Sequence, residues 1–121
     1  MKATERPVIA YIAARLISGR PASSVYDYQK GNYIFVDGTV SKRSVEVFDY
    51  AVGCYVSGDS SGSEFSLFHY GNSHFIDLTI AGDSFEGFDY GSSSFFSGEV
   101  DGTSISFFDY QQCIFFQYSI S

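Results

Sequence analysis

Carboxylate side chains recur along this chain at a nearly constant interval, each between two aromatic residues or beside them. The five equivalent positions are Asp27, Asp49, His69, Asp89 and Asp109, and a tyrosine follows each of them: Tyr28, Tyr50, Tyr70, Tyr90 and Tyr110. A row or ring of such oxygens can hold Ca²⁺, which takes roughly six to eight oxygen ligands. Rings beside carboxylates also suit carbohydrate, because rings cover the apolar faces of sugars and carboxylates accept from hydroxyl groups. The candidate ligand-binding residues are therefore Asp27, Asp49, His69, Asp89, Asp109, Tyr50, Tyr70, Tyr90 and Tyr110.

A structural role is the main alternative for the same positions. Each carboxylate lies shortly before a turn rich in Gly or Ser, where it can accept hydrogen bonds from loop N–H groups. The rings can stack on their equivalents across strands, which contributes about 0.5–1.5 kcal/mol per pair. Calcium is disfavoured because the acidic residues are dispersed and form no calcium loop. We expect turn bracing, with no metal and no cofactor.

Catalytic signatures are absent from the sequence. His69 and His74 lie on either side of a predicted turn, but there is no Gly-x-Ser-x-Gly elbow, phosphate loop or metal-ligand spacing. A glycosidase needs two carboxyl groups at a set separation in a cleft, but a periodic row can supply such a pair by accident and so does not indicate catalysis. His69 occupies the position of the repeated Asp, and we interpret it as sequence drift in one repeat and not as a catalytic base. We expect no catalytic residue and no enzyme.

The repeat period predicts the fold class. The tyrosines that close the motif are 22, 20, 20 and 20 residues apart, so five repeats occupy residues 23–121. Within one repeat, the extended runs "FEGFDY" and "FFSGEV" alternate with the turn-like segments "GSSS" and "DGTS". Asp101-Gly102 and Gly82-Asp83 are tight-hairpin signals. The chain is therefore predicted to be all-β with two short strands in each repeat.

Two chain paths fit this pattern. One is an antiparallel meander that forms a barrel or a strongly bent sheet, and the other is a parallel β-solenoid with an N-terminal helical cap. In a solenoid the repeated carboxylates stack about 4.8 Å apart and repel one another, whereas a meander doubles that spacing. The repulsion favours the meander.

Strand alternation assigns the two faces of the sheet. A turn at Asp101-Gly102 places Val100 opposite Thr103 and Phe96 opposite Phe107, and the preceding turn pairs Tyr90 with Phe95. The predicted core face then carries Ile76, Leu78, Ile80, Phe96, Val100, Ile105 and Phe107, together with Asp89 and Asp109. The opposite face carries Phe88, Tyr90, Phe95, Phe108 and Tyr110.

The segment 1–22 differs from the repeats and predicts one helix over residues 7–18. Pro7 suits a first helical turn, and the "SGRP" that ends at Pro21 is a strong stop. An apolar stripe runs along it: Val8, Ile9, Ile12, Ala13, Leu16 and Ile17. We expect the helix to pack on the apolar sheet face, or to plug the mouth or middle of a barrel. Segments 1–22 and 23–121 then make a single domain.

Composition narrows the function. The chain has 121 residues and a formal charge of −7, which argues against nucleic acid, since phosphate binding needs clustered Lys and Arg. Cys54 and Cys113 are expected to be free, packed thiols, and no apolar run is long enough for a membrane span. We expect a cytoplasmic, non-enzymatic structural or interaction repeat domain that forms homo-oligomers through its aromatic face. The alternative function is a carbohydrate-binding module that uses that face and the Asp row.

Overall fold

One helix is followed along the chain by ten strands in the computed structural model, which describes residues 1–121. The elements are α1 (Arg6–Ser18), β1 (Ser24–Asp27), β2 (Asn32–Val40), β3 (Ser44–Asp49), β4 (Cys54–Ser61), β5 (Glu64–His69), β6 (His74–Ala81), β7 (Ser84–Asp89), β8 (Ser94–Asp101), β9 (Ser104–Asp109) and β10 (Ile114–Ile120). The prediction of an all-β chain with one N-terminal helix and two strands per repeat is confirmed.

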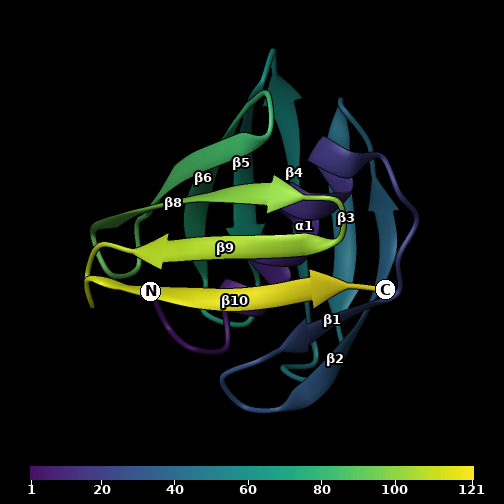
Figure 1. Ribbon diagram of the computed structural model, residues 1–121. Coiled ribbons are helices and arrows are strands. Elements are labelled where there is room, and N and C mark those ends of the chain that lie inside the picture. Colours follow the sequence, from purple (N-terminus) through teal and green to yellow (C-terminus); the bar gives the residue numbers. More distant parts are fainter.

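The ten strands form a closed barrel by the simplest route (Figure 1). Each strand pairs antiparallel with the next along the chain, and β10 closes the barrel against β1, where Val25 lies opposite Ile120. The antiparallel meander is therefore confirmed. The parallel solenoid is wrong, because every strand pair in the barrel is antiparallel.

The register differs by two residues from the one predicted. Val100 pairs with Ile105, not with Thr103, and Phe96 pairs with Asp109, not with Phe107. Tyr90 pairs with no strand residue, because Phe88 is the partner of Phe95. A shift of two residues preserves the alternation, so each side chain keeps the face that the sequence assigns to it.

Backbone conformation in the turns explains this shift. Gly102 (φ +62°) occupies the first turn position after Asp101, where two-residue hairpin turns require a positive φ. The loops that follow β1, β3, β5, β7 and β9 have four residues, and the last of these is left-handed, as in Ser93 (φ 54°) and Cys113 (φ 58°). These loops have the predicted lengths of two and four residues, but each lies one residue away from its predicted position. Because Ser and Cys seldom adopt the left-handed conformation, composition gave no sign of where the four-residue loops end.

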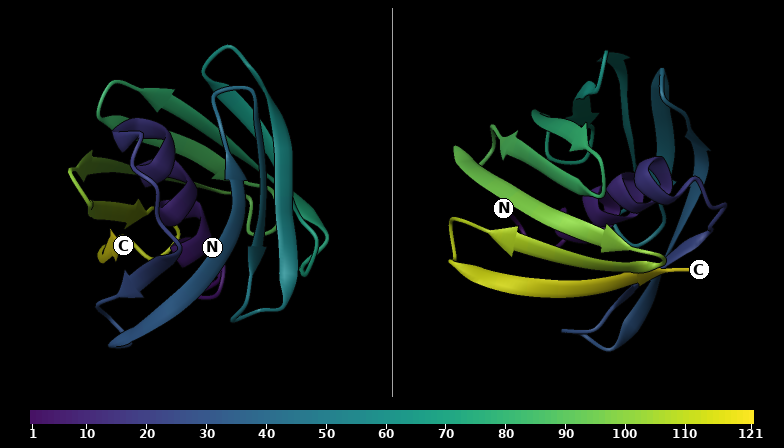
Figure 2. Two further views of the ribbon diagram at one scale, coloured as in Figure 1. Left: turned by 90° about the vertical axis from the view of Figure 1, so that its right-hand side faces the viewer. Right: turned by 45° about the horizontal axis from the view of Figure 1, so that its top comes forward.

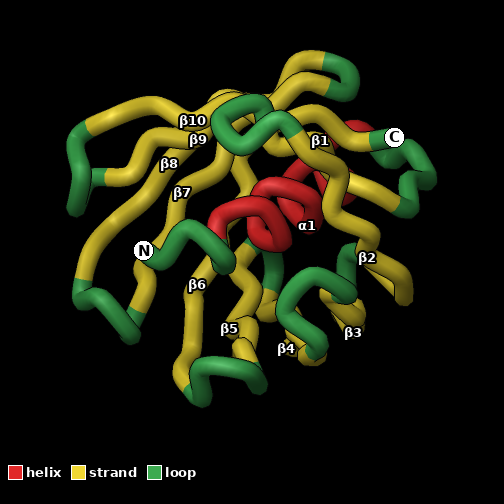
Figure 3. The backbone as a smooth tube through the Cα atoms, turned by 90° about the horizontal axis from the view of Figure 1, so that it is seen from below, coloured by secondary structure: helices red, strands yellow, loops and turns green.

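The helix runs through the interior of the barrel, with strands around it on all sides (Figures 2 and 3). Seven consecutive residues, Val8 to Ala14, are fully buried, so every face of α1 is covered and not only the predicted stripe. The helix contacts β1, β2, β6, β8, β9 and β10. It ends as predicted, at Gly19, which is left-handed (φ 68°) and donates its N–H to the carbonyl of Arg15.

The inner face of the wall supplies the rest of the core. Of the predicted core residues only Ile80 is half-buried, while the others are buried. Phe96 and Phe107 stack with ring centroids 5.2 Å apart. Gly98 leaves room for another ring, because a Cβ there would lie 2.3 Å from Phe85. Phe and Gly thus complement each other on adjacent strands.

We expect Ile12→Asp to destabilise the protein by more than about 4 kcal/mol, since it creates a cavity and buries an unpaired carboxylate inside the barrel. A thermal melt measures this effect, and we expect the variant to lose its cooperative unfolding transition. Arg20→Asp is the matched control, because Arg20 is exposed just beyond the helix and its change should stay within about 0.5 kcal/mol. Equal melting temperatures for the two variants would contradict the interior position of α1.

Candidate functional site

The repeated carboxylates line the inside of one end of the barrel. Their positions are the last residues of alternate strands, β1, β3, β5, β7 and β9, and their side chains are at most 2% exposed: Asp27, Asp49, His69, Asp89 and Asp109. The segment before α1 enters at this same end, where Arg6 and Glu5 contact this wall. The structure therefore brings the five predicted positions together as a buried ring.

Each member of the ring braces the loop that follows it. The carboxylate of Asp49 accepts from the N–H of Ala51 at 2.9 Å and from that of Val52 at 3.3 Å. Asp27, Asp89 and Asp109 accept from the N–H two residues ahead in the same way. His69 copies the pattern with Nδ1, which accepts from the N–H of Asn72 at 3.1 Å. The turn-bracing role predicted from the sequence is present at all five positions.

The members of the ring differ in their charge partners. Arg6 donates to Asp109 at 3.0 Å and to the carbonyl of Met1 at 2.7 Å, and its guanidinium lies 3.7 Å from the ring centre of Phe116. Asp49 forms no ion pair and is buried, and this burial raises the pKa of its carboxyl group against the opposing effect of the loop N–H groups. The same turn geometry therefore holds one carboxylate that is ion-paired, Asp109, and one that is not, Asp49.

Cys54 and His69 form the only arrangement that resembles a nucleophile and its base. Their Sγ and Nε2 atoms are 3.9 Å apart. Because Nδ1 of His69 accepts the N–H of Asn72, the ring proton lies on Nε2 and points to the sulfur. Burial lowers the pKa of His69 and raises the pKa of the Cys54 thiol, so both groups are held neutral. An activated thiolate has the opposite character. Both cysteines are free, as predicted, but they are not the packed core thiols that the sequence suggested, because Cys54 is half-buried and Cys113 is exposed.

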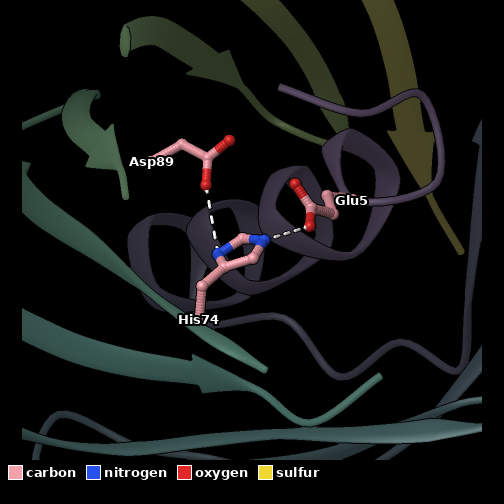
Figure 4. Close-up of side chains that lie close together, drawn as sticks. All are labelled: Glu5, His74 and Asp89. Atoms are coloured by element: carbon pink, nitrogen blue, oxygen red, sulfur yellow. Dashed lines mark hydrogen bonds and ion pairs between the residues drawn. The ribbon is translucent and has the colours of Figure 1, made fainter. Parts of the chain in front are cut away.

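A second cluster joins the segment before α1 to the barrel wall (Figure 4). The imidazole of His74 lies between two carboxylates, with Nε2 at 2.6 Å from Glu5 and Nδ1 at 3.3 Å from Asp89. Glu5 also accepts from the side-chain amide of Asn72. Sequence reasoning missed this cluster. Alternation places His74 on the inner face opposite His69, but no sequence signal marks Glu5 as buried.

The repeated rings lie outside the barrel and form what we call the aromatic belt. Its members are Tyr26, Tyr28, Tyr33, Phe48, Tyr50, Tyr55, Phe68, Tyr70, Phe75, Phe88, Tyr90, Phe95, Phe108, Tyr110 and Phe115. In each triplet the first ring meets the other two edge-to-face, with centroids 4.7–5.0 Å apart. The other two rings are 50–64% exposed. The barrel wall separates the predicted tyrosines from the buried ring of carboxylates, so the two sets do not meet.

The carboxylates that lie beside the belt come from the outer face of the barrel and not from the buried ring. Asp37 pairs across strands with Phe48 and Asp77 with Phe88, so both lie on the outer face. The hydroxyl of Tyr90 donates to Asp77 at 2.9 Å, and this hydrogen bond raises the pKa of Tyr90. A hollow of about 660 Å³ lies between two triplets, and its lining includes Tyr55, Tyr70 and Glu46.

Comparison with known protein families, with curated proteins and with solved structures gave no match to this chain. None of its helical structure has the length and apolarity that a membrane crossing requires. Function must therefore be inferred from the arrangement of its own side chains.

We expect Asp49→Asn and Asp109→Asn to change stability in opposite directions at pH 7. The raised pKa of Asp49 means that the folded state binds this proton more tightly than the unfolded chain does. The destabilising effect of ionised Asp49 is therefore full at pH values above that raised pKa, and it is lost as pH falls through it towards the ordinary value of 3.8. Asn avoids the buried charge and can still accept the loop N–H, so Asp49→Asn should stabilise the protein at pH 7, with the gain shrinking on acidification.

Asp109→Asn instead leaves Arg6 buried with its charge unbalanced, which should cost about 3–5 kcal/mol. Urea unfolding of both variants and of the wild type at several pH values gives the free energy of unfolding of each protein as a function of pH. A loss of stability at pH 7 in Asp49→Asn as large as that in Asp109→Asn would refute the electrostatic difference between the two sites.

Proposed function

We propose that this protein is a non-enzymatic interaction domain that self-associates through its aromatic belt. The observation that carries this proposal is the exposure of ten belt rings, each 50–64% open to solvent: Tyr28, Tyr33, Tyr50, Tyr55, Tyr70, Phe75, Tyr90, Phe95, Tyr110 and Phe115. An aromatic side chain presents about 150–250 Å², so these rings leave roughly 1,000 Å² of apolar surface. The largest patch on a monomeric protein is usually about 300–600 Å².

The rings of the belt are also held in place within the single chain. Edge-to-face contacts fix each exposed ring against the first ring of its triplet, as Phe88 does for Tyr90 and Phe95. Little side-chain freedom is then lost on binding, which favours association. A standard interface buries about 800 Å² on each partner. The triplets lie one per repeat around the closed barrel, so a partner would cover neighbouring triplets and not the whole belt.

A second copy of the chain is the occupant that these rings suit. The triplets consist only of Phe and Tyr, so two belts are self-complementary without further polar matching, as a symmetric dimer requires. The net charge of −7 opposes the contact, and so do the outer carboxylates beside the belt. Salt screens such repulsion, so association driven by rings should strengthen as ionic strength rises.

The interior supports a role without catalysis. The five repeated positions are buried and occupied by loop N–H groups, and the Cys54–His69 pair is neutral. None of these groups is presented to a substrate as an activated acid, base or nucleophile.

Sedimentation velocity at micromolar concentrations tests the proposal. We expect the wild type to form dimers or larger species whose proportion increases with salt, and the double variant Phe95→Ser with Phe115→Ser to be monomeric. Both rings are more than 60% exposed, so the variant should retain its fold and circular dichroism. Glu86→Ser with Glu99→Ser is the control from the polar part of β7 and β8 and should still associate. A wild type that remains monomeric at every salt concentration would rule out self-association.

Carbohydrate binding is a second candidate, favoured by the hollow whose lining contains Tyr55, Tyr70 and Glu46. Two exposed rings and a carboxylate are a suitable set for a sugar, although the buried Asp ring would take no part. Titration calorimetry with a panel of neutral oligosaccharides separates the candidates, because Tyr70→Ala should abolish sugar binding there and leave most of the belt intact.

A further inference from the structure

Three ionisable groups from separate elements converge where α1 enters the barrel. Glu5 directly precedes α1, His74 begins β6 and Asp89 ends β7 (Figure 4). One possible ligand atom from each lies within 4.8 Å of the others. They lie at a pocket of about 500 Å³ that Asn72, Gly91 and Ser92 also line. The set comprises one imidazole nitrogen and two carboxylates beside an accessible space.

Glu5 gives an independent observation at this site. Its side chain is fully buried, and its Oε2 accepts from Asn72 and contacts His74, but its Oε1 has no hydrogen-bond partner. A buried carboxylate oxygen without a donor costs the full desolvation of that atom. A cation that Glu5 binds through both carboxylate oxygens would supply the missing partner of Oε1.

The surrounding charge also favours a cation. Five carboxylates are buried at this end of the barrel: Glu5, Asp27, Asp49, Asp89 and Asp109. The buried cations beside them are Arg6 and the Met1 ammonium group, and both lie closest to Asp109. Glu5 and Asp89 share His74 as a partner, and Asp89 also faces the Met1 ammonium group at 4.0 Å. A divalent ion would neutralise both carboxylates.

We propose that Glu5, His74 and Asp89 bind a divalent transition-metal ion of the Zn²⁺ type. Imidazole selects such ions over Ca²⁺ and Mg²⁺, which prefer oxygen ligands alone. Three protein ligands leave further positions open to water from the pocket. The two ring nitrogens of His74 face different carboxylates, so one ion reaches all three residues after the imidazole turns and one nitrogen faces the ion. Protons compete with the ion for these ligands, so affinity falls as pH falls.

Neighbouring polar groups already hold the two carboxylates. The amide of Asn72 donates to Glu5, the N–H of Gly91 donates to Asp89 at 3.0 Å, and the hydroxyl of Ser92 donates to Asp89 at 2.7 Å. Metal sites use outer contacts of this kind to orient their ligands. A bound ion would join the segment before α1 to β6 and β7, and so fasten the helix to the wall. This site is independent of the aromatic belt.

The test uses the full chain, freed of metal by a chelator and carrying no histidine tag. We expect calorimetric titration with ZnCl₂ to show one bound equivalent, with a raised melting temperature, and MgCl₂ to show neither. His74→Ala and Glu5→Gln should each weaken Zn²⁺ binding at least about tenfold. Cys54→Ser with His69→Asn is the matched control, because it removes the other close pair of soft ligands and should leave binding unchanged.

Imidazole ¹⁵N spectra of the wild type give a readout that does not depend on the variants folding. Zn²⁺ should shift the His74 nitrogens and leave those of His69 in place. No Zn²⁺ binding by the wild type, shifts confined to His69, or loss of binding only in the Cys54→Ser, His69→Asn control would each overturn the assignment.

Discussion

A closed wall of ten strands surrounds more space than its own inward side chains can fill, since barrels of about eight strands are already just filled by them. In this protein α1 occupies the surplus volume. Small residues on the helix, Ala10, Ala13 and Ala14, are fully buried and let the wall approach it closely, while Tyr11 and Ile12 fill the wider parts. Barrel and helix therefore depend on each other: neither has a complete core alone.

Burial of the whole helix brings polar groups to one end of the interior. Glu5 and Arg6 lie at the start of α1, and both are buried. Alternate strands end there in Asp or His, and one of them offers Asp109 to Arg6, while His74 at the start of β6 contacts Glu5. On another part of the ring, Asp49 and Cys54 face each other across strands without an ion pair. One repeated motif thus braces the five loops at this end of the barrel and also provides a set of unequal sites around the helix entrance.

The sequence was most informative where side-chain alternation alone decides the outcome. The 20-residue period and the apolar alternation predicted the strands, their antiparallel order and the faces of residues such as Phe96 and Phe88. They did not predict the register, because Ser93 and Cys113 adopt left-handed conformations that composition does not announce. They also did not show that every side of the helix is covered, since burial of Ala10 and Ala14 depends on closure of the barrel. Glu5 was missed because a lone acidic residue before a helix usually lies in solvent.

The order in which the chain is made has a consequence for this design. α1 precedes every strand, so it leaves the ribosome before any part of the wall exists. The hairpins of the meander are local and can form one after another during synthesis. The final pairing, however, joins β10 to β1, and until then the apolar helix has an open trough beside it. During translation the apolar helix therefore emerges before the wall and is enclosed only when β10 pairs with β1. Until then its exposed apolar surface can aggregate or be bound by chaperones.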